Sequence, residues 1–336
     1  MKIRNWHTND KTLIIAEIGN NHEGNLETAI EMVDAAADSG ADVVKFQMIE
    51  PQKLVSRDQI ERINQLKKFS LSKEDFTKIA KRSNEKGVIF MATPFYLEAV
   101  HFLNDLVPAF KLASSDIDFY PLIRAIAVTK KPVLISCGTA TKNDILKARD
   151  ILEDIWKGID ADPGYAFLHC VSNYPTDLGD ANLKRILRLK KLFPIVGYSD
   201  HTLGIDSCIV AVSLGAKIIE KHFTLDKTRS TFHDHQLSAD PDDFQEMVTR
   251  IRAVETIISD GPSLDELDFD YSSIRRVAAA SRDLICGEKI ESKDLLWLRP
   301  GENKGISLSN EGDIIGKVLI KDVRVGEIIK LEDIKR

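Results

Sequence analysis

The residue types in this sequence that are best suited to binding and catalysis follow short apolar runs. Lys45 and Lys111 stand in two such runs, VVKFQ and AFKLAS, and each is followed by amide or hydroxyl residues. Lysines and hydroxyl groups at equivalent depth form an anion pocket, and a phosphate fits it because its oxygens accept many charge-assisted hydrogen bonds. One lysine on a strand is more often an edge residue, so the pair favours a binding site. Other runs supply further hydroxyl donors, namely Thr93, Ser114, Ser136 and Ser199.

Two histidines, His201 and His222, stand at the ends of the last two runs, IVGYSD and IIEKHF. Imidazoles that converge from neighbouring strands, completed by a carboxylate or a water, suit a divalent transition metal. Either histidine alone would be interpreted as a structural residue, so the metal hypothesis depends on the pair. Asp200 is expected to orient the ring of His201 or its loop. His233 and His235, in STFHDHQLS, form a second, less favoured metal site.

The period of a β-strand predicts which of these side chains meet. Side chains alternate between the two faces of a strand, so Lys45 and Gln47 share one face, and Glu220 shares a face with His222. Glu17, in the first apolar run, is expected to face the same cavity. Its carboxylate would be available there for acid–base or metal-bridging work.

The elements that must position these residues form a repeating pattern. Each of eight β-branched apolar runs is followed by a longer amphipathic segment, as in 25–39, 72–85 and 142–156. Asn25 is a suitable N-cap for the first of these segments, and Gly40 ends it. The eight runs are Leu13–Gly19, Val43–Gln47, Ile89–Phe95, Ala109–Ser114, Val133–Gly138, Tyr165–Ser172, Ile195–Asp200 and Ile218–Phe223.

Continuous apolar strands that alternate with helices indicate a parallel sheet covered by helices. Eight such units in about 250 residues predict a (β/α)8 TIM barrel rather than an open doubly wound sheet. No GxGxxG motif follows the first strand, which weakens a dinucleotide-binding alternative. Barrel enzymes carry their chemistry at the carboxyl ends of the strands, where the polar residues of this sequence cluster.

Composition restricts the class of protein. The chain has 336 residues, is 43% hydrophobic and 29% charged, and carries a net charge of −6. The negative charge argues against a nucleic acid or an anionic membrane as the main partner. No apolar run reaches the ~18 residues needed to span a bilayer. The first ten residues, MKIRNWHTND, lack the apolar core of a signal peptide, so a cytoplasmic enzyme is expected.

The pattern changes near the C-terminus. The segment 259–273, SDGPSLDELDFDYSS, is acidic and lacks sustained periodicity, which favours a linker over a long surface loop of the barrel. Short elements separated by glycines follow, which predicts a small β-rich domain that must dock on another surface to be stable. The predicted division is a catalytic barrel over 1–262, a linker over 263–280 and a small domain over 281–336.

Several motifs together resemble those of the sialic acid synthase (N-acetylneuraminate synthase) family. They are IIAEIGNNHEGN, VVKFQ, ATPF, FKLASSD, HCVSNYPT, YSDHT and EKHFT, in this order, with WLRPGENKGIS, IIGK and VRVGEIIKLEDI near the C-terminus. The last three resemble the antifreeze-like (SAF) domain of these enzymes. The resemblance covers nearly the whole chain and implies a TIM barrel followed by an SAF domain. It also implies a domain-swapped homodimer, in which the small domain of one chain covers the barrel mouth of the other.

The resemblance implies an activity and a role for each site residue. Members condense phosphoenolpyruvate (PEP) with an N-acylated mannosamine-type sugar and release phosphate, assisted by a divalent metal, commonly Mn²⁺ or Mg²⁺. His201 and His222 would bind the metal, and Glu17 would be the acid–base carboxylate. The residues implied to hold PEP are Lys45, Thr93, Lys111, Ser114, Ser136, Ser172 and Ser199. Those implied to contact the sugar are Gln47, Asp116, Tyr174, Asp234 and Arg299, the last supplied by the partner chain.

Three positions depart from the family pattern. Asp116 stands where the motif usually has Glu, Ser172 stands where an Asn that helps to bind PEP is usual, and Cys137 replaces the common Thr of LSTG. These departures bear on the identity of the sugar more than on the reaction. Two other functions stay open: a PEP–aldose condensing enzyme that makes a 3-deoxy-octulosonate or heptulosonate phosphate, and a binding protein without catalytic activity.

Overall fold

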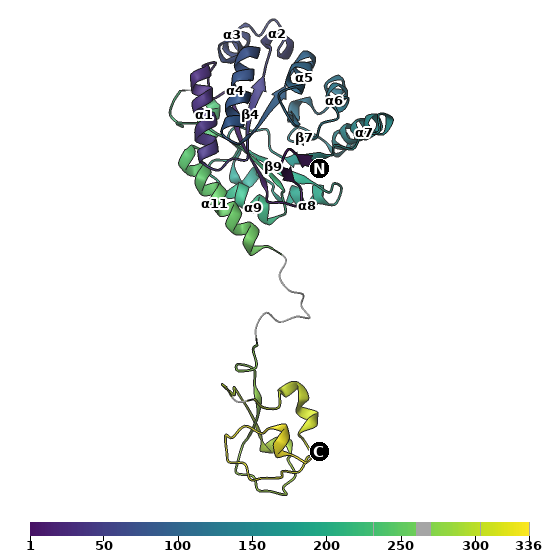
Figure 1. The fold of residues 1–336 in the computed structure, drawn as a ribbon, viewed down its shortest axis with the longest axis vertical. Coiled ribbons are helices and arrows are strands. Elements are labelled where there is room, and N and C mark those ends of the chain that lie inside the picture. Colours follow the sequence, from purple (N-terminus) through teal and green to yellow (C-terminus); the bar gives the residue numbers. More distant parts are fainter. Residues whose placement is uncertain (231, 260–269, 303, 336) are drawn as a thin grey trace. The chain divides into compact units, whose positions relative to one another are not determined.

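The computed structural model describes residues 1–230, 232–259, 270–302 and 304–335. The chain divides into two compact units, Met1–Ser259 and Asp260–Arg336. Figure 1 shows the first unit as a ring of helices around a central set of strands. The domain boundaries 262, 263–280 and 281 stay predictions, because much of the predicted linker lies outside the described residues.

The first unit contains an eight-stranded parallel sheet in the order β5-β4-β3-β10-β9-β8-β7-β6. The two end strands, β5 and β6, lie in contact, so the sheet curves into a nearly closed barrel. The predicted (β/α)8 fold is therefore confirmed, and each predicted run corresponds to one strand, although β4 extends one residue beyond its run, to Met48. These are β3 (Leu13–Gly19), β4 (Val43–Met48), β5 (Ile89–Pro94), β6 (Phe110–Leu112), β7 (Val133–Ser136), β8 (Tyr165–His169), β9 (Val196–Asp200) and β10 (Ile218–His222).

Helices follow the strands, and four of those that the structure describes, α1, α4, α7 and α11, begin at a residue whose side chain caps the first turn. Asn25 accepts a hydrogen bond from the backbone N–H of Thr28 at 2.8 Å, which satisfies one free donor of the first turn. Ser72 and Asp75 form a reciprocal capping box at the next predicted helix. The helices of this unit are α1 (Leu26–Asp38), α2 (Pro51–Leu54), α3 (Ile60–Phe69), α4 (Lys73–Glu85), α5 (Leu97–Asn104), α6 (Tyr120–Ala127), α7 (Lys142–Gly158), α8 (Lys184–Lys190), α9 (Asp206–Ser213), α10 (His233–Leu237) and α11 (Pro241–Ile257).

The interior of the barrel is apolar at one end and polar at the other. Inward side chains near the amino ends of the strands form a buried apolar cluster, which includes Leu13, Val43 and Ile218. A short hairpin of β1 (Lys2–Ile3) and β2 (Trp6–His7) packs on this cluster and closes that end. Since strand side chains alternate, the next inward positions toward the carboxyl ends carry the polar residues. The open mouth of the barrel is therefore polar.

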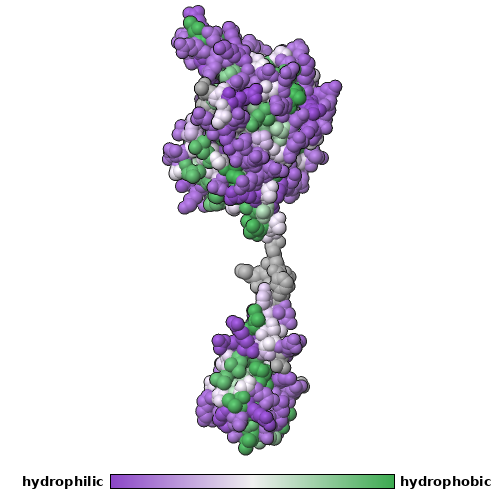
Figure 2. Space-filling model, turned by 90° about the vertical axis from the view of Figure 1, so that its left-hand side faces the viewer, coloured by the Kyte–Doolittle hydropathy of each residue, from purple (hydrophilic) through white to green (hydrophobic). Residues whose placement is uncertain are grey.

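The second unit is small and has its own core. Strands β11 (Val277–Ala280) and β12 (Leu295–Leu298) pair antiparallel, and isolated bridges join residues 284 and 323, 289 and 318, and 319 and 334. Figure 2 shows apolar patches on the surface of this unit. Apolar groups left exposed in this way are typical of an interaction surface. The exposed large side chains of this unit include Ile274, Ile285, Leu308, Ile320, Val325 and Leu331.

No helix among the residues that the structure describes is long and apolar enough to cross a membrane.

Candidate active site

The polar ends of the barrel strands meet in one cavity of about 340 Å³ at the mouth of the barrel. Thirteen of the fifteen residues that were assigned a site role from the sequence line it, although they come from all eight strands or the loops that follow them. They are Glu17, Lys45, Gln47, Thr93, Lys111, Ser114, Ser136, Ser172, Tyr174, Ser199, His201, His222 and Asp234. The sequence thus predicted correctly that these side chains meet.

Two predicted site residues do not line this cavity in the described structure. Asp116 lies at the end of a short 3-10 helix, Ser114–Asp116, in which Ser114 and Ser115 face the cavity and the half-buried Asp116 does not. Arg299 belongs to the second unit, directly after β12. Their proposed contacts with the sugar stay predictions.

Lys45 and Glu17 form a buried ion pair. Lys45 Nζ lies 2.6 Å from Glu17 Oε2, and Lys45 also donates to Thr93 Oγ1 at 3.2 Å. Gln47 Nε2 donates to the other carboxylate oxygen of Glu17 at 2.8 Å. Burial raises the pKa of Glu17 more than the adjacent ammonium lowers it. A carboxyl group with a raised pKa, held by two fixed donors, suits proton transfer at this position.

Glu220, for which no role was predicted from the sequence, lies between the two lysines. Lys111 Nζ lies 3.5 Å from Glu220 Oε1, Lys45 Nζ lies 3.8 Å from Oε2, and Ser199 Oγ donates to Oε1 at 2.9 Å. Burial opposes ionisation, but the two ammonium groups prevail and lower the pKa of Glu220 to about 2. The sequence feature that could have predicted Glu220 as a cavity residue is its position two residues before His222, which places both side chains on the same face of the strand.

Hydroxyl donors complete the anion pocket beside the lysines. The buried Ser136 Oγ has no hydrogen-bond partner among the described residues, and Ser114 Oγ and Ser172 Oγ lie 3.0 Å apart. Gly138 makes this close packing possible, since a Cβ built on it would overlap Ser172 Oγ and approach Cys170 Sγ to 2.8 Å. A buried hydroxyl without a partner is expensive, so this pocket suits a ligand rich in oxygen acceptors.

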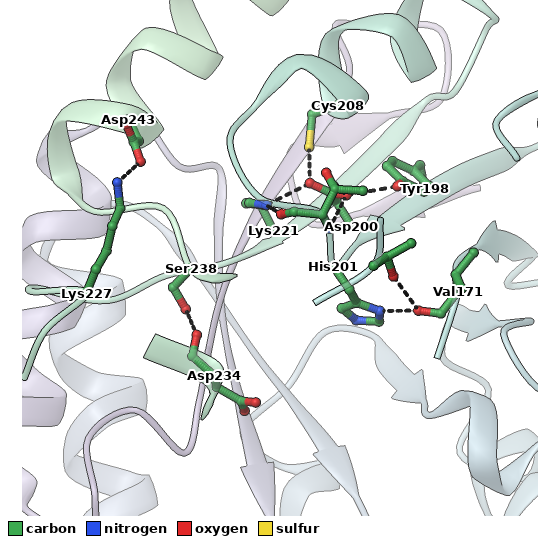
Figure 3. A network of polar contacts seen from close by, with 12 residues as sticks. Val171, Tyr198, Asp200, His201, Cys208, Lys221, Lys227, Asp234, Ser238 and Asp243 are labelled. Atoms are coloured by element: carbon green, nitrogen blue, oxygen red, sulfur yellow. Dashed lines mark hydrogen bonds and ion pairs between the residues drawn. The ribbon is translucent and has the colours of Figure 1, made fainter. Parts of the chain in front are cut away.

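His201 and His222 lie with their ring centroids 5.5 Å apart. His201 Nδ1 contacts the carbonyl oxygen of Val171 at 2.6 Å (Figure 3), and because a carbonyl only accepts, this nitrogen carries the proton. Its Nε2 is therefore the free acceptor. Burial lowers the pKa of both rings, that of His222 to about 4, so both are neutral near pH 7.

These properties fit a divalent cation held by the two histidines. Neutral imidazole is the form that binds metals, and a ligating ring commonly donates its second N–H to a backbone carbonyl, as His201 does. The buried His222 Nδ1 makes no hydrogen bond within the described residues and lies 3.9 Å from Asp234 Oδ2. No cluster of three or more candidate ligands occurs in the part of the chain that is described. Water or substrate oxygens would therefore complete the coordination.

Asp200 was expected to orient the His201 ring or its loop, and His233 and His235 were the alternative metal site. Asp200 contacts the loop rather than the ring: its Oδ1 accepts from the backbone N–H of Thr202 at 2.9 Å. His235, of the alternative metal site, is fully buried and its Nδ1 lies 2.7 Å from Thr224 Oγ1. The side chain of His233 lies outside the described residues.

Some residues that line the cavity are not among those predicted from the sequence. They are Asn20, Arg62, Phe95, Thr139, Cys170 and Phe232, among others. Most of them lie on loops or on α3, where no strand periodicity relates them to the polar strand ends. Asn20 is held in place because its Nδ2 donates to Gln47 Oε1 at 3.0 Å.

Comparison with known proteins shows to which family the chain belongs. The model of the NeuB family matches residues 32–263, and that of the SAF domain matches residues 275–335. The chain belongs to the NeuB family. It is therefore an enzyme, a transferase of the sialic acid synthase type, and the resemblance inferred from its motifs is confirmed.

Relatives of this NeuB protein align over almost its full length. It is 37% identical to the N,N'-diacetyllegionaminic acid synthase of Legionella pneumophila, with 96% of this chain and 94% of that protein covered. It is 34% identical to a pseudaminic acid synthase of Campylobacter jejuni, with 99% of each covered. The crystal structure of N-acetylneuraminic acid synthetase from Leptospira borgpetersenii, in complex with citrate, has a TM-score of 0.74 and 34% identity, and covers 80% of this chain and 92% of that one.

Proposed function

We propose that this NeuB protein condenses PEP with an N-acylated mannosamine-type amino sugar. The products would be a nine-carbon 2-keto-3-deoxy acid of the sialic acid type and phosphate, used in the biosynthesis of surface glycans. Relatives along the whole chain are named as synthases of such acids, which supports the reaction class. The single observation that carries the proposal is the anion pocket of Lys45 and Lys111 beside the histidine pair in one cavity.

The chain's own residues would bind and orient PEP. Lys45 and Lys111 would pair with the anionic oxygens of PEP, and the hydroxyl groups of Ser136 and Ser114 would donate to its phosphate or carboxylate. The remaining members of the PEP site would be Thr93, Ser172 and Ser199. In this pose the lysines also stabilise the charge that develops on the departing phosphate.

The reaction forms a C–C bond between PEP C3 and the sugar and a C–O bond between water and PEP C2, and it breaks the bond between C2 and the phosphate oxygen. PEP C3 attacks the aldehyde carbon of the open-chain sugar, positive charge develops at C2, and a water adds there. Glu17 would orient or deprotonate that water, or balance the cationic centre, and phosphate then leaves from C2. A divalent metal, Mn²⁺ or Mg²⁺, held by His201 and His222, would supply Lewis-acid polarisation of the aldehyde oxygen.

The sugar would occupy the outer part of the cavity. Gln47, Tyr174 and Asp234 line it and would contact the sugar, with Asp116 contributing from beside the cavity. Arg299 of a partner chain would donate to the N-acyl carbonyl, since a guanidinium is a suitable donor to an amide oxygen. This proposal includes a domain-swapped homodimer and a cytoplasmic location, and the apolar surface of the second unit supports docking on another surface (Figure 2).

A phosphate-release screen tests this function and identifies the sugar. The purified protein is incubated with PEP, Mn²⁺ and a panel of N-acetylmannosamine, its 6-phosphate and 2,4-diacetamido-trideoxy hexoses, and products are identified by mass. One amino sugar should release one phosphate for each PEP consumed. Its product should be heavier than the sugar by the mass of one pyruvate molecule, which PEP supplies. Phosphorylated aldoses without an N-acyl group serve as the comparison, because turnover with them would favour a 3-deoxy-octulosonate or heptulosonate phosphate synthase. No phosphate release with any sugar would favour a binding protein without catalytic activity.

A further inference from the structure

A second buried ion pair, between Asp200 and Lys221, lies on strands β9 and β10, on the side that faces away from the cavity. Parallel strands β9 and β10 are neighbours, and Lys221 pairs with Asp200 in their register. Ser199 and Glu220, next to them, face the cavity. Because side chains alternate, Asp200 and Lys221 point outward, between the sheet and helix α9, where Cys208 Sγ contacts Asp200 Oδ2 at 3.5 Å.

This pair holds the segment on both sides of His201. Lys221 Nζ lies 2.7 Å from Asp200 Oδ2 and donates to the carbonyl oxygen of Thr202 at 2.5 Å. Asp200 Oδ1 accepts from the Tyr198 hydroxyl at 2.8 Å and from the backbone N–H and Oγ1 of Thr202, each at 2.9 Å. Figure 3 shows the contacts of Asp200 with Lys221, Tyr198 and Cys208. The backbone at His201 is thus fixed at the residues before and after it.

The same contacts tie His201 to His222. Lys221 directly precedes His222 on β10, and its ammonium reaches across to both neighbours of His201. The ion pair therefore links the two histidine backbones by a rigid path of side-chain contacts outside the cavity. Any shift of one strand end against the other would break these contacts.

Burial argues that the pair has a role other than stability. The relative exposure of Asp200 is 0% and that of Lys221 is 1%. Removing two charges from water carries a large desolvation cost, and their attraction roughly offsets it, so apolar residues of similar volume would serve stability at least as well. What the charged pair adds is a fixed geometry, because each of its oxygen and nitrogen atoms has a defined partner.

We propose that Asp200 and Lys221 are positioning residues that set the separation of the His201 and His222 rings for one divalent cation. This inference depends on the metal site of the proposed function. It goes beyond that site because neither residue touches the cation or the substrates. Partners outside the ligand set commonly change metal affinity about tenfold to a hundredfold when they are removed.

The test uses a double variant, because Asp200→Asn alone would leave a buried ammonium unpaired and could prevent folding. Asp200→Asn with Lys221→Met removes both charges at nearly constant volume. The matched control is Asp42→Asn with Arg252→Met, which removes an ion pair of 2.9 Å at the other end of the barrel. Both full-length variants are first compared with the wild type by urea unfolding.

Two readouts that do not use turnover are then measured on metal-free protein. Mn²⁺ affinity is measured by electron paramagnetic resonance, and long-range ¹H–¹⁵N spectra of the histidine side chains report the Nδ1–H of His201. We expect the Asp200/Lys221 variant to bind Mn²⁺ about tenfold to a hundredfold more weakly and to lose the protected Nδ1–H signal, with the control unchanged. Affinity within about twofold of the wild type, with the signal retained, would overturn the inference.

The two readouts also separate this inference from the proposed function. If the wild type does not bind Mn²⁺, the proposed metal site is wrong. The spectra then decide the positioning role by themselves: loss of the His201 signal in the Asp200/Lys221 variant supports it, and an unchanged signal overturns it.

Discussion

Lys45 Nζ lies 2.6 Å from Glu17 Oε2, and both side chains are almost fully buried at the mouth of the barrel. The pair places a cation and a carboxylate from neighbouring strands within reach of one substrate. A buried ion pair is poor evidence of a stabilising role, since desolvation offsets its attraction. The desolvation cost of this pair is explained if the ammonium of Lys45 binds an anionic substrate and the carboxylate of Glu17 accepts or donates a proton.

Glu17→Gln should lower kcat by about 10²- to 10⁴-fold, the usual contribution of a general acid or base. The amide oxygen still accepts from Lys45, so the KM for PEP should change little, whereas the hydrogen bond from Gln47 Nε2 is lost and stability should fall slightly. Steady-state phosphate release, with circular dichroism to check folding, measures both. A variant that keeps more than about a third of the wild-type kcat would remove Glu17 from the chemistry.

Lys45→Met should raise the KM for PEP by about 10- to 150-fold, because a hydrogen bond to a charged group contributes roughly 1.5–3 kcal/mol. Lys53→Met is the matched control. Its ammonium is half-exposed, pairs with Glu50 and Glu98, and does not line the cavity. Initial rates as a function of PEP concentration measure the effect, and equal KM values for the two variants would exclude Lys45 from the PEP site.

Gly138→Ala should weaken PEP binding by about tenfold or more, since the new methyl group displaces Ser172 Oγ and crowds Cys170 within the pocket. Gly158→Ala, near the end of α7, is the control because its Cβ would meet no atom within 4 Å. That change should raise stability by about 0.5–1 kcal/mol, as a helical glycine is replaced. Calorimetric titration with PEP measures the affinity of both variants. If Gly138→Ala binds PEP as tightly as the wild type, PEP binds elsewhere.

Asp116→Asn should stabilise the protein at pH 7 and have no effect near pH 3.5. Burial raises the pKa of Asp116 from 3.8 to about 6, and the neighbouring Asp118 adds to this. Between these values the native state binds more protons than the unfolded state, so stability falls as pH rises through that window. Above pH 6 both states are ionised and the full penalty is present. Below pH 3.8 both are protonated and it is absent.

The expected gain at pH 7 is about 1–2 kcal/mol, because Asp116 is partly exposed and solvent screens part of the penalty that burial imposes on its charge. Urea unfolding from pH 3.5 to pH 7.5 measures it. Asp118→Asn should give a smaller gain in the same direction, since it removes only the repulsion. Destabilisation of Asp116→Asn at pH 7 would contradict this electrostatic account.

Removal of divalent metal should lower turnover by about 100-fold or more, and added Mn²⁺ or Mg²⁺ should restore it. His222→Asn should need far more metal for the same rate. His235→Gln should keep the wild-type metal requirement, because His235 contacts Thr224 instead of the cavity. Activity is titrated with metal after chelation. Full activity in the presence of chelator would exclude the metal role of both His201 and His222.

Strand periodicity explains why so much of the site could be predicted. Glu17, Lys45 and His222 all occupy inward positions at the carboxyl ends of strands, and a barrel brings all such positions to one mouth. Asp116 differs because it follows β6 in a 3-10 turn, where the period of the strand no longer holds. The loop residue Asn20 and the helical residue Arg62 were missed for the same reason.

The sequence by itself determined the (β/α)8 order, the family and the set of polar strand ends, because these depend on local period and on residue type. Only the tertiary structure decided the pairing among them. It joins Glu220 to both lysines, gives His201 its Nδ1 proton through Val171, and turns Asp200 toward Lys221 instead of the His201 ring. Such choices depend on distances between strands that are far apart in the chain, and they fix the charge and the free nitrogen of each group. Local sequence carries no information about those distances.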